Sequence, residues 1–310
     1  MTQPLPSITI VIPNLNGSRF LRECIQSILI QEYPRLQLFF CDGGSSDDSL
    51  DIANEYRESF FKIDSIRDNG PAEAINRALM AATGDVFHWI NSDDVLEPGA
   101  LHVIGRAFLQ DSEASVVAGK VINFRDSDKS FAGGSDNRNL NYKEFFQYCC
   151  GFTSRLNWHQ PGCWWKTTHI LSVGGVNPNY KAYFDRELFL RLLRTRHNVK
   201  YINSIVLRFR FHEDQISHVS SGWKRHELRL ILKKEVAYNT HNLGYYRAWL
   251  KAYYWAKRLK TYEHLPNSSH AIDLMRFIVE VLKDPLVRLR PQCGTKKALT
   301  SLISRQSILN

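Results

Sequence analysis

Two adjacent carboxylates, Asp93 and Asp94, follow a short apolar run and suggest metal chemistry. Neighbouring like charges repel, so the pair costs stability unless solvent or a cation relieves the repulsion. Hard divalent cations such as Mg²⁺ or Mn²⁺ take oxygen ligands, usually a carboxylate or two together with substrate phosphates. The pair therefore predicts a metal site, although a solvated turn in which Asp93 caps a helix begun at Pro98 explains the same residues.

Two more carboxylates, Asp42 and Asp68, stand at matching places, each after another short apolar run. Buried strands are predicted for four such runs, 8–12, 36–41, 62–67 and 86–90. The helical spacing between them predicts parallel βαβ units with helices on both faces of the sheet. Since ligands in such sheets bind beyond the carboxyl ends of the strands, we expect Asp42, Asp68 and the Asp93–Asp94 pair at one rim.

The second half of the chain has a less regular pattern. Apolar runs predict strands over 114–124 and 199–207, and an amphipathic helix opens at Asp185. The stretch 126–141 is rich in Gly, Ser, Asn and Asp, which predicts a mobile loop.

Charge is distributed unevenly and marks a boundary near Gly222. Residues 1–222 hold 23 Lys and Arg against 25 Asp and Glu, whereas residues 223–310 hold 17 against 6, a net charge of +11. The basic excess predicts an anionic partner for the second segment, whether a membrane, a nucleic acid or a phosphorylated acceptor. We expect one domain over 1–222 and then a basic helical extension over 223–310.

Several functional classes are disfavoured by what the sequence lacks. The Gly-x-Gly-x-x-Gly of dinucleotide-binding proteins does not follow the first apolar run, and the Gly-x-x-x-x-Gly-Lys-Ser/Thr of P-loop proteins is missing. The six cysteines follow no CxxC spacing, which predicts free thiols in a reducing compartment and no zinc site. Residues 1–7 lack the pattern of a signal peptide, and no run of about 18 apolar residues predicts a membrane span.

Five short motifs occur in order along the first half: Pro13-Asn14-Leu15-Asn16, Asp42-Gly43-Gly44-Ser45-Ser46-Asp47, Asp68-Asn69-Gly70 with Ala74-Ile75-Asn76, Ala82-Thr83-Gly84-Asp85 and Asn91-Ser92-Asp93-Asp94. Together they resemble family 2 glycosyltransferases of the bacterial polysaccharide type. The resemblance covers about residues 6–217 and is specific because several motifs agree in both order and spacing. It implies the GT-A fold, a Rossmann-like α/β architecture with a mostly parallel central sheet flanked by helices. It also implies that 1–222 is a catalytic domain, with a nucleotide-binding half over about 1–95 and an acceptor half over 96–222.

The resemblance also implies a nucleotide pocket. Asp42 is similar to the family's carboxylate that accepts the uracil N3–H, and Asp68 is similar to a second acid that contacts the base. For both, an ordinary turn or cap residue is the alternative. The backbone near Pro13 and Asn14 would line the same pocket, and further substrate contacts are implied for the motif asparagines Asn16, Asn76 and Asn91.

Metal and diphosphate contacts follow from the same resemblance. Asn91 replaces the first Asp of the family's Asp-x-Asp, which shifts the binding of Mg²⁺ or Mn²⁺ to the two aspartates that follow. Asp93 would contact the ribose or the metal, and Asp94 would hold the metal against the diphosphate. His212, in a segment that resembles the family's closing Arg-x-His, would be a further metal or phosphate contact, and Arg210 would face the diphosphate.

Transfer to a sugar hydroxyl needs a base, because the hydroxyl is a poor nucleophile until its proton is removed. Asp185 matches the aligned Asp of the family's base segment, with Glu187 as the alternative base and a helix N-cap as the structural alternative for Asp185. A single base of this kind predicts one displacement with inversion. The His159-Gln160 pair resembles a pair found in a polysaccharide-type subset and would line the donor-sugar or acceptor pocket, unless His159 is structural.

We therefore predict an inverting, metal-dependent glycosyltransferase that moves a sugar from a nucleoside-diphosphate sugar, with UDP favoured, to a glycan or lipid-linked acceptor in cell-surface polysaccharide synthesis. The alternative is a non-catalytic module of the same fold that binds a sugar nucleotide or a polysaccharide. Aromatic and basic residues at helical spacing over 246–260 predict that a cytoplasmic protein contacts the inner membrane face through 223–310. The alternative there is a helix packed on the catalytic domain, and no nucleic-acid partner is expected.

Overall fold

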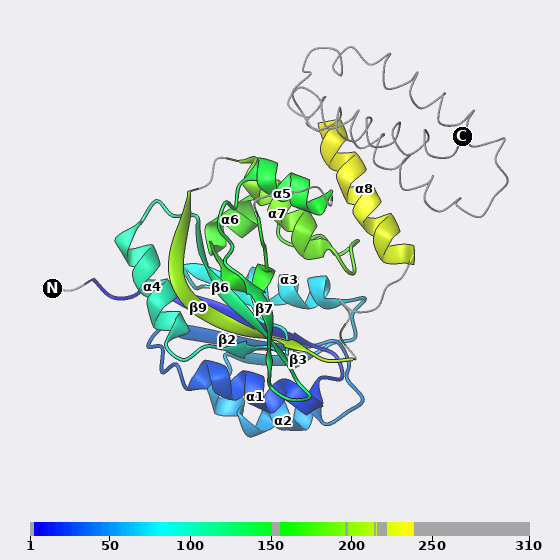
Figure 1. The fold of residues 1–310 in the computed structure, drawn as a ribbon. Coiled ribbons are helices and arrows are strands. Elements are labelled where there is room, and N and C mark those ends of the chain that lie inside the picture. The colour runs from blue at the N-terminus through cyan, green and yellow to red at the C-terminus, as the bar shows by residue number, and fades with distance from the viewer. Residues whose placement is uncertain (1–2, 151–155, 196–197, 214, 216–221, 239–310) are drawn as a thin grey trace, which may run out of the picture. The chain divides into compact units, whose positions relative to one another are not determined.

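The computed structural model describes residues 3–150, 156–195, 198–213, 215 and 222–238. The chain divides into two compact units, Met1–Arg229 and Leu230–Asn310. The sheet and the helices that cover it belong to the first unit (Figure 1). None of the helices described is both long and apolar enough to cross a bilayer. The aromatic and basic stretch 246–260, which predicts membrane contact, lies outside the described residues.

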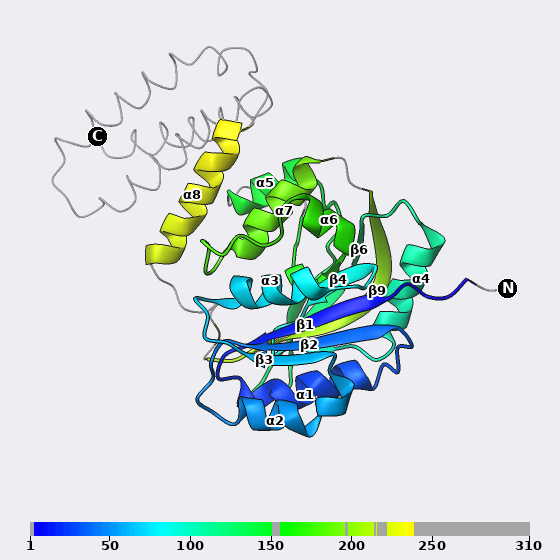
Figure 2. The ribbon, with the colours of Figure 1, turned by 180° about the vertical axis from the view of Figure 1, so that it is seen from behind.

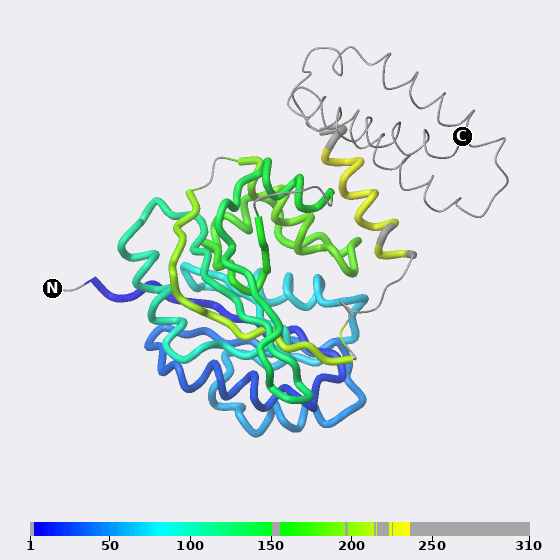
Figure 3. The backbone as a smooth tube through the Cα atoms, in the orientation of Figure 1, coloured from blue at the N-terminus to red at the C-terminus, as the bar shows by residue number. Residues whose placement is uncertain are grey.

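The strands of the described residues form one mixed sheet in the order β3-β2-β1-β4-β8-β6-β9-β5, and β7 pairs with β6. Their bounds are β1 Ile8–Asn14, β2 Leu36–Asp42, β3 Lys62–Ser65, β4 Val86–Trp89, β5 Val95–Leu96, β6 Val116–Arg125, β7 Phe131–Ser135, β8 Cys163–Lys166 and β9 Val199–Phe211. The first four strands pair in parallel, whereas β8 is antiparallel to both β4 and β6. β6 and β9 run parallel and side by side (Figure 3).

Eight helices are described: α1 Ser18–Leu29, α2 Ser49–Glu55, α3 Pro71–Ala81, α4 Ala100–Gln110, α5 Tyr142–Cys149, α6 Thr167–Ser172, α7 Phe184–Arg194 and α8 Gly222–Tyr238, with single 3-10 turns at Arg57–Ser59 and Gln160–Gly162. α1 and α2 cover one face of β1 to β3, and α3 covers the other (Figures 1 and 2). α3 begins with Pro71, whose fixed φ suits the first helical position. Helices on both faces confirm the expected architecture.

The centre of the core is β1, which is buried on both faces. Its isoleucines Ile8, Ile10 and Ile12 belong to the same buried cluster as the apolar residues of α1. Burial on both faces is why the strand has a continuous apolar sequence instead of an alternating one. Just before β4 the chain passes close to β1. Residue 84 is glycine because an added Cβ there would lie only 2.5 Å from the Thr9 hydroxyl oxygen.

The expected loop over 126–141 is wrong in part, because it contains β7, which pairs antiparallel with β6. Its sequence, Phe-Ala-Gly-Gly-Ser, has little strand propensity. The close approach to β6 explains the glycines: a Cβ on Gly134 would lie 2.3 Å from the Val121 carbonyl oxygen. Packing against a long neighbouring strand therefore overrides local propensity. The same stretch ends with Asn141, whose side chain caps α5 by accepting a hydrogen bond from the Glu144 N–H.

Candidate active site

A cavity of about 570 Å³ opens at the expected rim of the sheet. One wall is formed by Pro13 and Asn14 at the end of β1 and by Asn91 and Asp93 after β4. The rest of the lining comes from the start of α7, the residues at and just after the end of β9 and the His159–Pro161 segment. Segments that are far apart in sequence therefore meet around one volume.

The structure brings most of the predicted site residues to this cavity, and it separates five of them from it. The cavity lining includes Pro13, Asn14, Asn16, Asp68, Asn91, Asp93, His159, Gln160, Asp185 and His212. The predicted residues outside that lining are Asp42, Asn76, Asp94, Glu187 and Arg210. The same motifs supply residues inside and outside the lining, so the direction of each side chain decides whether it faces the cavity.

Asp93 and His212 lie together in the cavity wall. The Nε2 atom of His212 is 3.0 Å from Oδ2 of Asp93, and the two side chains are 9% and 24% exposed respectively. β9 carries His212 to this point because Leu207 and Arg208 pair with β5, which begins two residues after Asp93. The ring of Phe20 packs on the imidazole with a centroid distance of 4.8 Å. A carboxylate and an imidazole that face one cavity are two groups able to ligate a divalent cation.

Asp94 takes a structural position instead of the metal contact expected for it. Its side chain is fully buried, Oδ1 accepts a hydrogen bond from the Arg210 backbone N–H at 3.1 Å, and Oδ2 accepts one from Asn91 at 3.3 Å. Burial, followed by the neighbouring charge of Asp93, raises the pKa of Asp94 well above its ordinary value. Asp94 therefore fastens the turn after β4 to β9, while Asp93 faces the cavity.

Arg210 does not face the cavity, contrary to the expected contact with the diphosphate. Its side chain is 1% exposed, and the guanidinium forms ion pairs with Asp126 at 2.9 Å and Glu23 at 2.6 Å. Its Nε atom donates a hydrogen bond to the Asp93 carbonyl oxygen at 2.8 Å. Arg210 therefore holds the backbone of the residue that lines the cavity.

The residues present suit a divalent cation whose coordination shell the substrate would complete. Within the part of the chain that the structure describes, no group of three or more His, Cys, Asp and Glu residues could hold a metal ion. Asp93 and His212 are the two candidate ligands among the described residues of the cavity wall, and water and phosphate oxygens would fill further positions. This division suits Mg²⁺, which commonly binds through one or two carboxylates plus substrate phosphates, and the imidazole nitrogen suits a transition metal.

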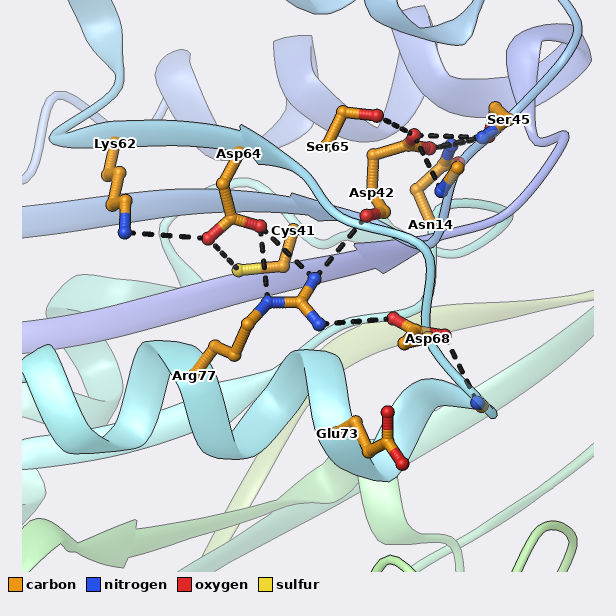
Figure 4. Close-up of polar contacts among 12 residues, drawn as sticks. Asn14, Cys41, Asp42, Ser45, Lys62, Asp64, Ser65, Asp68, Glu73 and Arg77 are labelled. Carbon is orange, nitrogen blue, oxygen red and sulfur yellow. Dashed lines mark hydrogen bonds and ion pairs between the residues drawn. The ribbon is translucent and has the colours of Figure 1, made fainter.

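Asp42 is fully buried at the end of β2 and has no face in the cavity lining. Its carboxylate accepts five hydrogen bonds, from the backbone N–H groups of Gly44 and Ser45 and from the side chains of Asn14, Ser45 and Ser65 (Figure 4). Burial alone would raise the pKa of Asp42, but these hydrogen bonds outweigh it and lower the pKa. Asp42 therefore organises the loop after β2.

The loop after β2 extends to Asp48, and α2 begins at the next residue. Ser45 or Ser46 looks suited to cap a helix with Asp47 and Asp48 in its first turn, yet α2 begins only at Ser49. The Ser45 hydroxyl donates to Asp42 instead, and the Asp47 carboxylate accepts hydrogen bonds from the Ser18 and Ser49 N–H groups. The serines and the aspartate hold the loop against α1.

Asp68, the second expected nucleotide contact, does line the cavity. Its carboxylate accepts hydrogen bonds from Arg77 at 3.3 Å and from the Gly70 N–H at 3.0 Å. Arg77, on α3, also donates to Asp64 at 3.1 Å and to the Asp42 carbonyl oxygen at 3.3 Å (Figure 4). The sequence motifs did not indicate Arg77 or Asp64. The only sequence signal for their contact is that Arg77 is a basic residue on the otherwise apolar face of α3 that packs on the sheet.

Asp185 is the second residue of α7 and lines the cavity. Burial raises its pKa to about 6, while the charge of Arg186 acts in the opposite direction. The N-cap residue of α7 is Tyr183, and Oδ1 of Asp185 accepts a hydrogen bond from the Arg186 N–H at 2.7 Å in the first turn. Glu187, the alternative base, forms a two-contact ion pair with Arg191 at 2.7 and 2.9 Å and lies outside the cavity lining. The geometry therefore favours Asp185 as the base.

His159 and Gln160 lie in the cavity wall, and Asn76 does not. The His159 ring packs edge-on against Phe209 with a centroid distance of 5.1 Å, and burial lowers its pKa, which keeps the imidazole neutral. Gln160 donates a hydrogen bond to the Trp89 carbonyl oxygen at 3.4 Å. Asn76 is paired with the backbone of Val176 through two hydrogen bonds of 2.6 and 2.9 Å, so it joins α3 to the segment before α7.

Four cationic side chains in the lining had no motif to indicate them: Arg19, Lys181, Arg186 and Lys224. They come from three separate parts of the chain, and Lys224 lies beyond the expected boundary at Gly222. Together with the acids Asp68, Asp93 and Asp185, they give the cavity charges of both signs. Cations of this kind suit an anionic ligand such as a diphosphate.

Residues 9–160 match the family model described as glycosyl transferase family 2. The hyaluronan synthase of Pasteurella multocida is 25% identical over 244 residues, which are 78% of this chain and 24% of that protein. A PGL/p-HBAD biosynthesis glycosyltransferase of Mycobacterium bovis is 33% identical over 142 residues, which are 44% of this chain and 55% of that protein. The chain thus spans about a quarter to about a half of the length of these relatives.

Two solved structures share the fold. The 1–349 fragment of S. aureus TarS in complex with UDP-GlcNAc has a TM-score of 0.63 at 13% identity, over 90% of this chain and 81% of that chain. Mannosyltransferase PcManGT from Pyrobaculum calidifontis, in complex with GDP-Man and Mn²⁺, has a TM-score of 0.57 at 16% identity, over 91% of this chain and 82% of that chain. At these identities the likeness concerns the fold alone, and it confirms the expected GT-A architecture.

Proposed function

We propose that the protein moves a sugar from a nucleoside-diphosphate sugar to a hydroxyl acceptor, with inversion. The match of residues 9–160 to the glycosyl transferase family 2 model supports the reaction class. One observation carries the proposal. The Asp93–His212 pair and Asp185, whose pKa is raised to about 6, line the same cavity. The Asp93–His212 pair suits the diphosphate end of a donor, and Asp185 suits the acceptor hydroxyl.

Asp185 would remove the proton from the acceptor hydroxyl as the new glycosidic bond forms. A base with a pKa near 6 is ionised at neutral pH and still accepts a proton, which is the balance that general-base catalysis needs. The acceptor oxygen then attacks the anomeric carbon from the side opposite the departing diphosphate. A single displacement of this kind inverts the anomeric configuration.

The donor end is assigned to Asp68, Asp93 and His212. Asp68, held by Arg77, would accept a hydrogen bond from the nucleobase. A divalent cation bound at Asp93 and His212 would neutralise charge that develops on the leaving diphosphate. Arg19 and Lys181 would add cationic contacts from the cavity wall. UDP is the favoured nucleotide, which the UDP-GlcNAc complex of TarS supports, and GDP is the competing one, which the GDP-Man complex of PcManGT supports.

The acceptor we propose is a glycan or a lipid-linked saccharide of a cell-surface polysaccharide. The support is the similarity to the hyaluronan synthase of P. multocida. We further propose that the protein works in the cytoplasm at the inner membrane face, to which the basic segment 223–310 would attach. The charge of that segment supports this placement.

A panel of sugar nucleotides with Mn²⁺, Mg²⁺ or EDTA tests the proposal through released nucleoside diphosphate and the anomeric configuration of the product. Asp185→Asn should bind the donor with unchanged affinity and transfer about 10²-fold more slowly or worse. Glu187→Gln, two residues away, is the matched control and should stay near the wild-type rate. A chain that binds a donor but never releases the diphosphate in the presence of acceptors would be the binding module instead.

A further inference from the structure

Glu227 of α8 makes an unusual set of contacts with the segment before α7. The Glu227 side chain is 8% exposed, and its carboxylate accepts hydrogen bonds from three consecutive backbone N–H groups. Oε2 accepts from Lys181 at 3.0 Å, and Oε1 accepts from Ala182 at 2.9 Å and from Tyr183 at 2.7 Å. Hydrogen bonds to an ionised acceptor are about twice as strong as neutral ones, so this clamp fixes the three peptide groups firmly.

The clamp lies where α7 needs an acceptor. Helix starts leave backbone N–H groups without partners inside the helix and carry partial positive charge. Tyr183 is the N-cap residue of α7, and its side chain makes no cap hydrogen bond. Glu227 supplies the missing negative group from another helix, so the start of α7 depends on α8.

The same segment carries Asp185 into the cavity. Lys181, Ala182 and Tyr183 line the cavity together with Asp185, two residues further on. The charged or titratable groups near the Asp185 carboxylate are Arg186 and Tyr183 on its own segment, Tyr148 on α5 and Glu227 on α8. A shift of the 181–183 backbone would therefore move Asp185 relative to anything bound in the cavity.

We propose that Glu227 is a positioning residue whose carboxylate holds the 181–183 backbone so that Asp185 keeps its reactive geometry. The proposal rests on the function proposed above for Asp185. It makes the first turns of α8 a working part of the active site, although they lie beyond the boundary that the charge pattern marks at Gly222. Lys224, one turn before Glu227, is 7% exposed and lines the cavity, which agrees with this placement.

The decisive measurements compare Glu227→Ala and Glu227→Gln with Glu113→Gln, a control at an exposed carboxylate between α4 and β6. A misplacement of about 1 Å can cost about 10²-fold in rate, so kcat of Glu227→Ala should fall about 10- to 100-fold, and by more than donor affinity does. Glu227→Gln keeps the length and one acceptor oxygen and should restore part of kcat. Because the negative charge of Glu227 raises the pKa of Asp185, both variants should move the acid limb of the pH–rate profile to lower pH. A merely structural contact would shift that limb through the lost charge but would leave kcat on the pH plateau unchanged.

Hydrogen–deuterium exchange separates this proposal from the proposed function. The amides of residues 181–183 should exchange faster in Glu227→Ala than in the wild type or Glu113→Gln, whether or not the protein is turning over. Unchanged exchange, or an unchanged kcat on the pH plateau in folded Glu227→Ala, would overturn the positioning role alone. A wild-type protein with protected amides that transfers no sugar from any donor would overturn the proposed function, and with it the catalytic purpose of the clamp.

Discussion

Asp93 and Asp94 are neighbours with the same functional group, and burial separates their roles. Asp93 faces the cavity beside His212, whereas Asp94 is fully buried and accepts a hydrogen bond from the backbone of Arg210. Asp93→Asn should lower metal-dependent kcat/KM by about 10²- to 10³-fold, the usual cost of removing one group that stabilises developing charge. Asp94→Asn keeps an oxygen that can accept from Arg210 and should retain far more activity. Turnover at varied Mn²⁺ gives the comparison, with thermal unfolding as the control for folding. Equal losses in the two variants would contradict this division.

The raised pKa of Asp185 predicts how activity and stability depend on pH. Below about pH 6 the carboxyl is protonated and cannot accept the acceptor proton, so kcat/KM should rise through an acid limb near 6 and then level. The folded-state pKa exceeds the unfolded one, so ionisation of Asp185 costs stability as the pH rises from about 4 to about 6. Asp185→Asn should therefore be more stable than the wild type at pH 7 and nearly equal to it at pH 4. Thermal unfolding at the two pH values measures this, and an equal difference at both would rule out the raised pKa.

At the scale of elements, β9 assembles the metal end of the site, and two arginines on it offer a matched test. Arg210 is 1% exposed and pairs with Asp126 and Glu23, whereas Arg208, two residues earlier, is 39% exposed and pairs with Glu97. Arg210→Met would leave the Asp93 carbonyl oxygen without its donor and remove a buried cation, so it should destabilise the fold by about 1–3 kcal/mol. Arg208→Met should change the free energy of unfolding by at most about 1 kcal/mol. Urea unfolding of the two variants is the measurement, and similar losses would refute the structural role given to Arg210.

The elements also show what the sequence could predict. Strand ends fix where a residue lies along a rim, so the motifs after β1, β3 and β4 correctly predicted that Asn14, Asp68 and Asp93 would share a cavity. They could not predict that Asp42 turns inward, because its five hydrogen-bond donors include Ser65 from the neighbouring strand. β7 was missed for a related reason, since its pairing depends on contact with β6 and its own residues have weak strand propensity.

At the scale of the whole molecule, residues far apart in sequence complete the site. Glu227 and Lys224 reach the cavity region from a helix that local composition assigns to a separate extension. Composition reports solvent exposure averaged over a segment, and it carries no information about which turn of a helix is buried against another element. The polar pattern of α8 therefore hid the burial of Lys224 and Glu227, each of which needs partners to offset the cost of leaving water.

The charge asymmetry of the chain gives the last prediction. The segment 223–310 carries a net charge of +11, from 17 basic and 6 acidic residues, and about 1 kcal/mol of attraction to an anionic surface is expected for each basic residue close to it. The protein should therefore sediment with vesicles that contain anionic lipid and release them as salt shortens the Debye length from about 10 Å to about 3 Å. Replacing Lys251, Lys257 and Lys260 together by Gln should weaken binding. The same change at Arg57, Arg67 and Arg106, three exposed basic residues of the first unit, should not. If sedimentation did not change with anionic lipid, with salt or with the position of the substituted charges, an electrostatic membrane contact would be excluded. The basic excess would then serve another anionic partner, such as the acceptor itself.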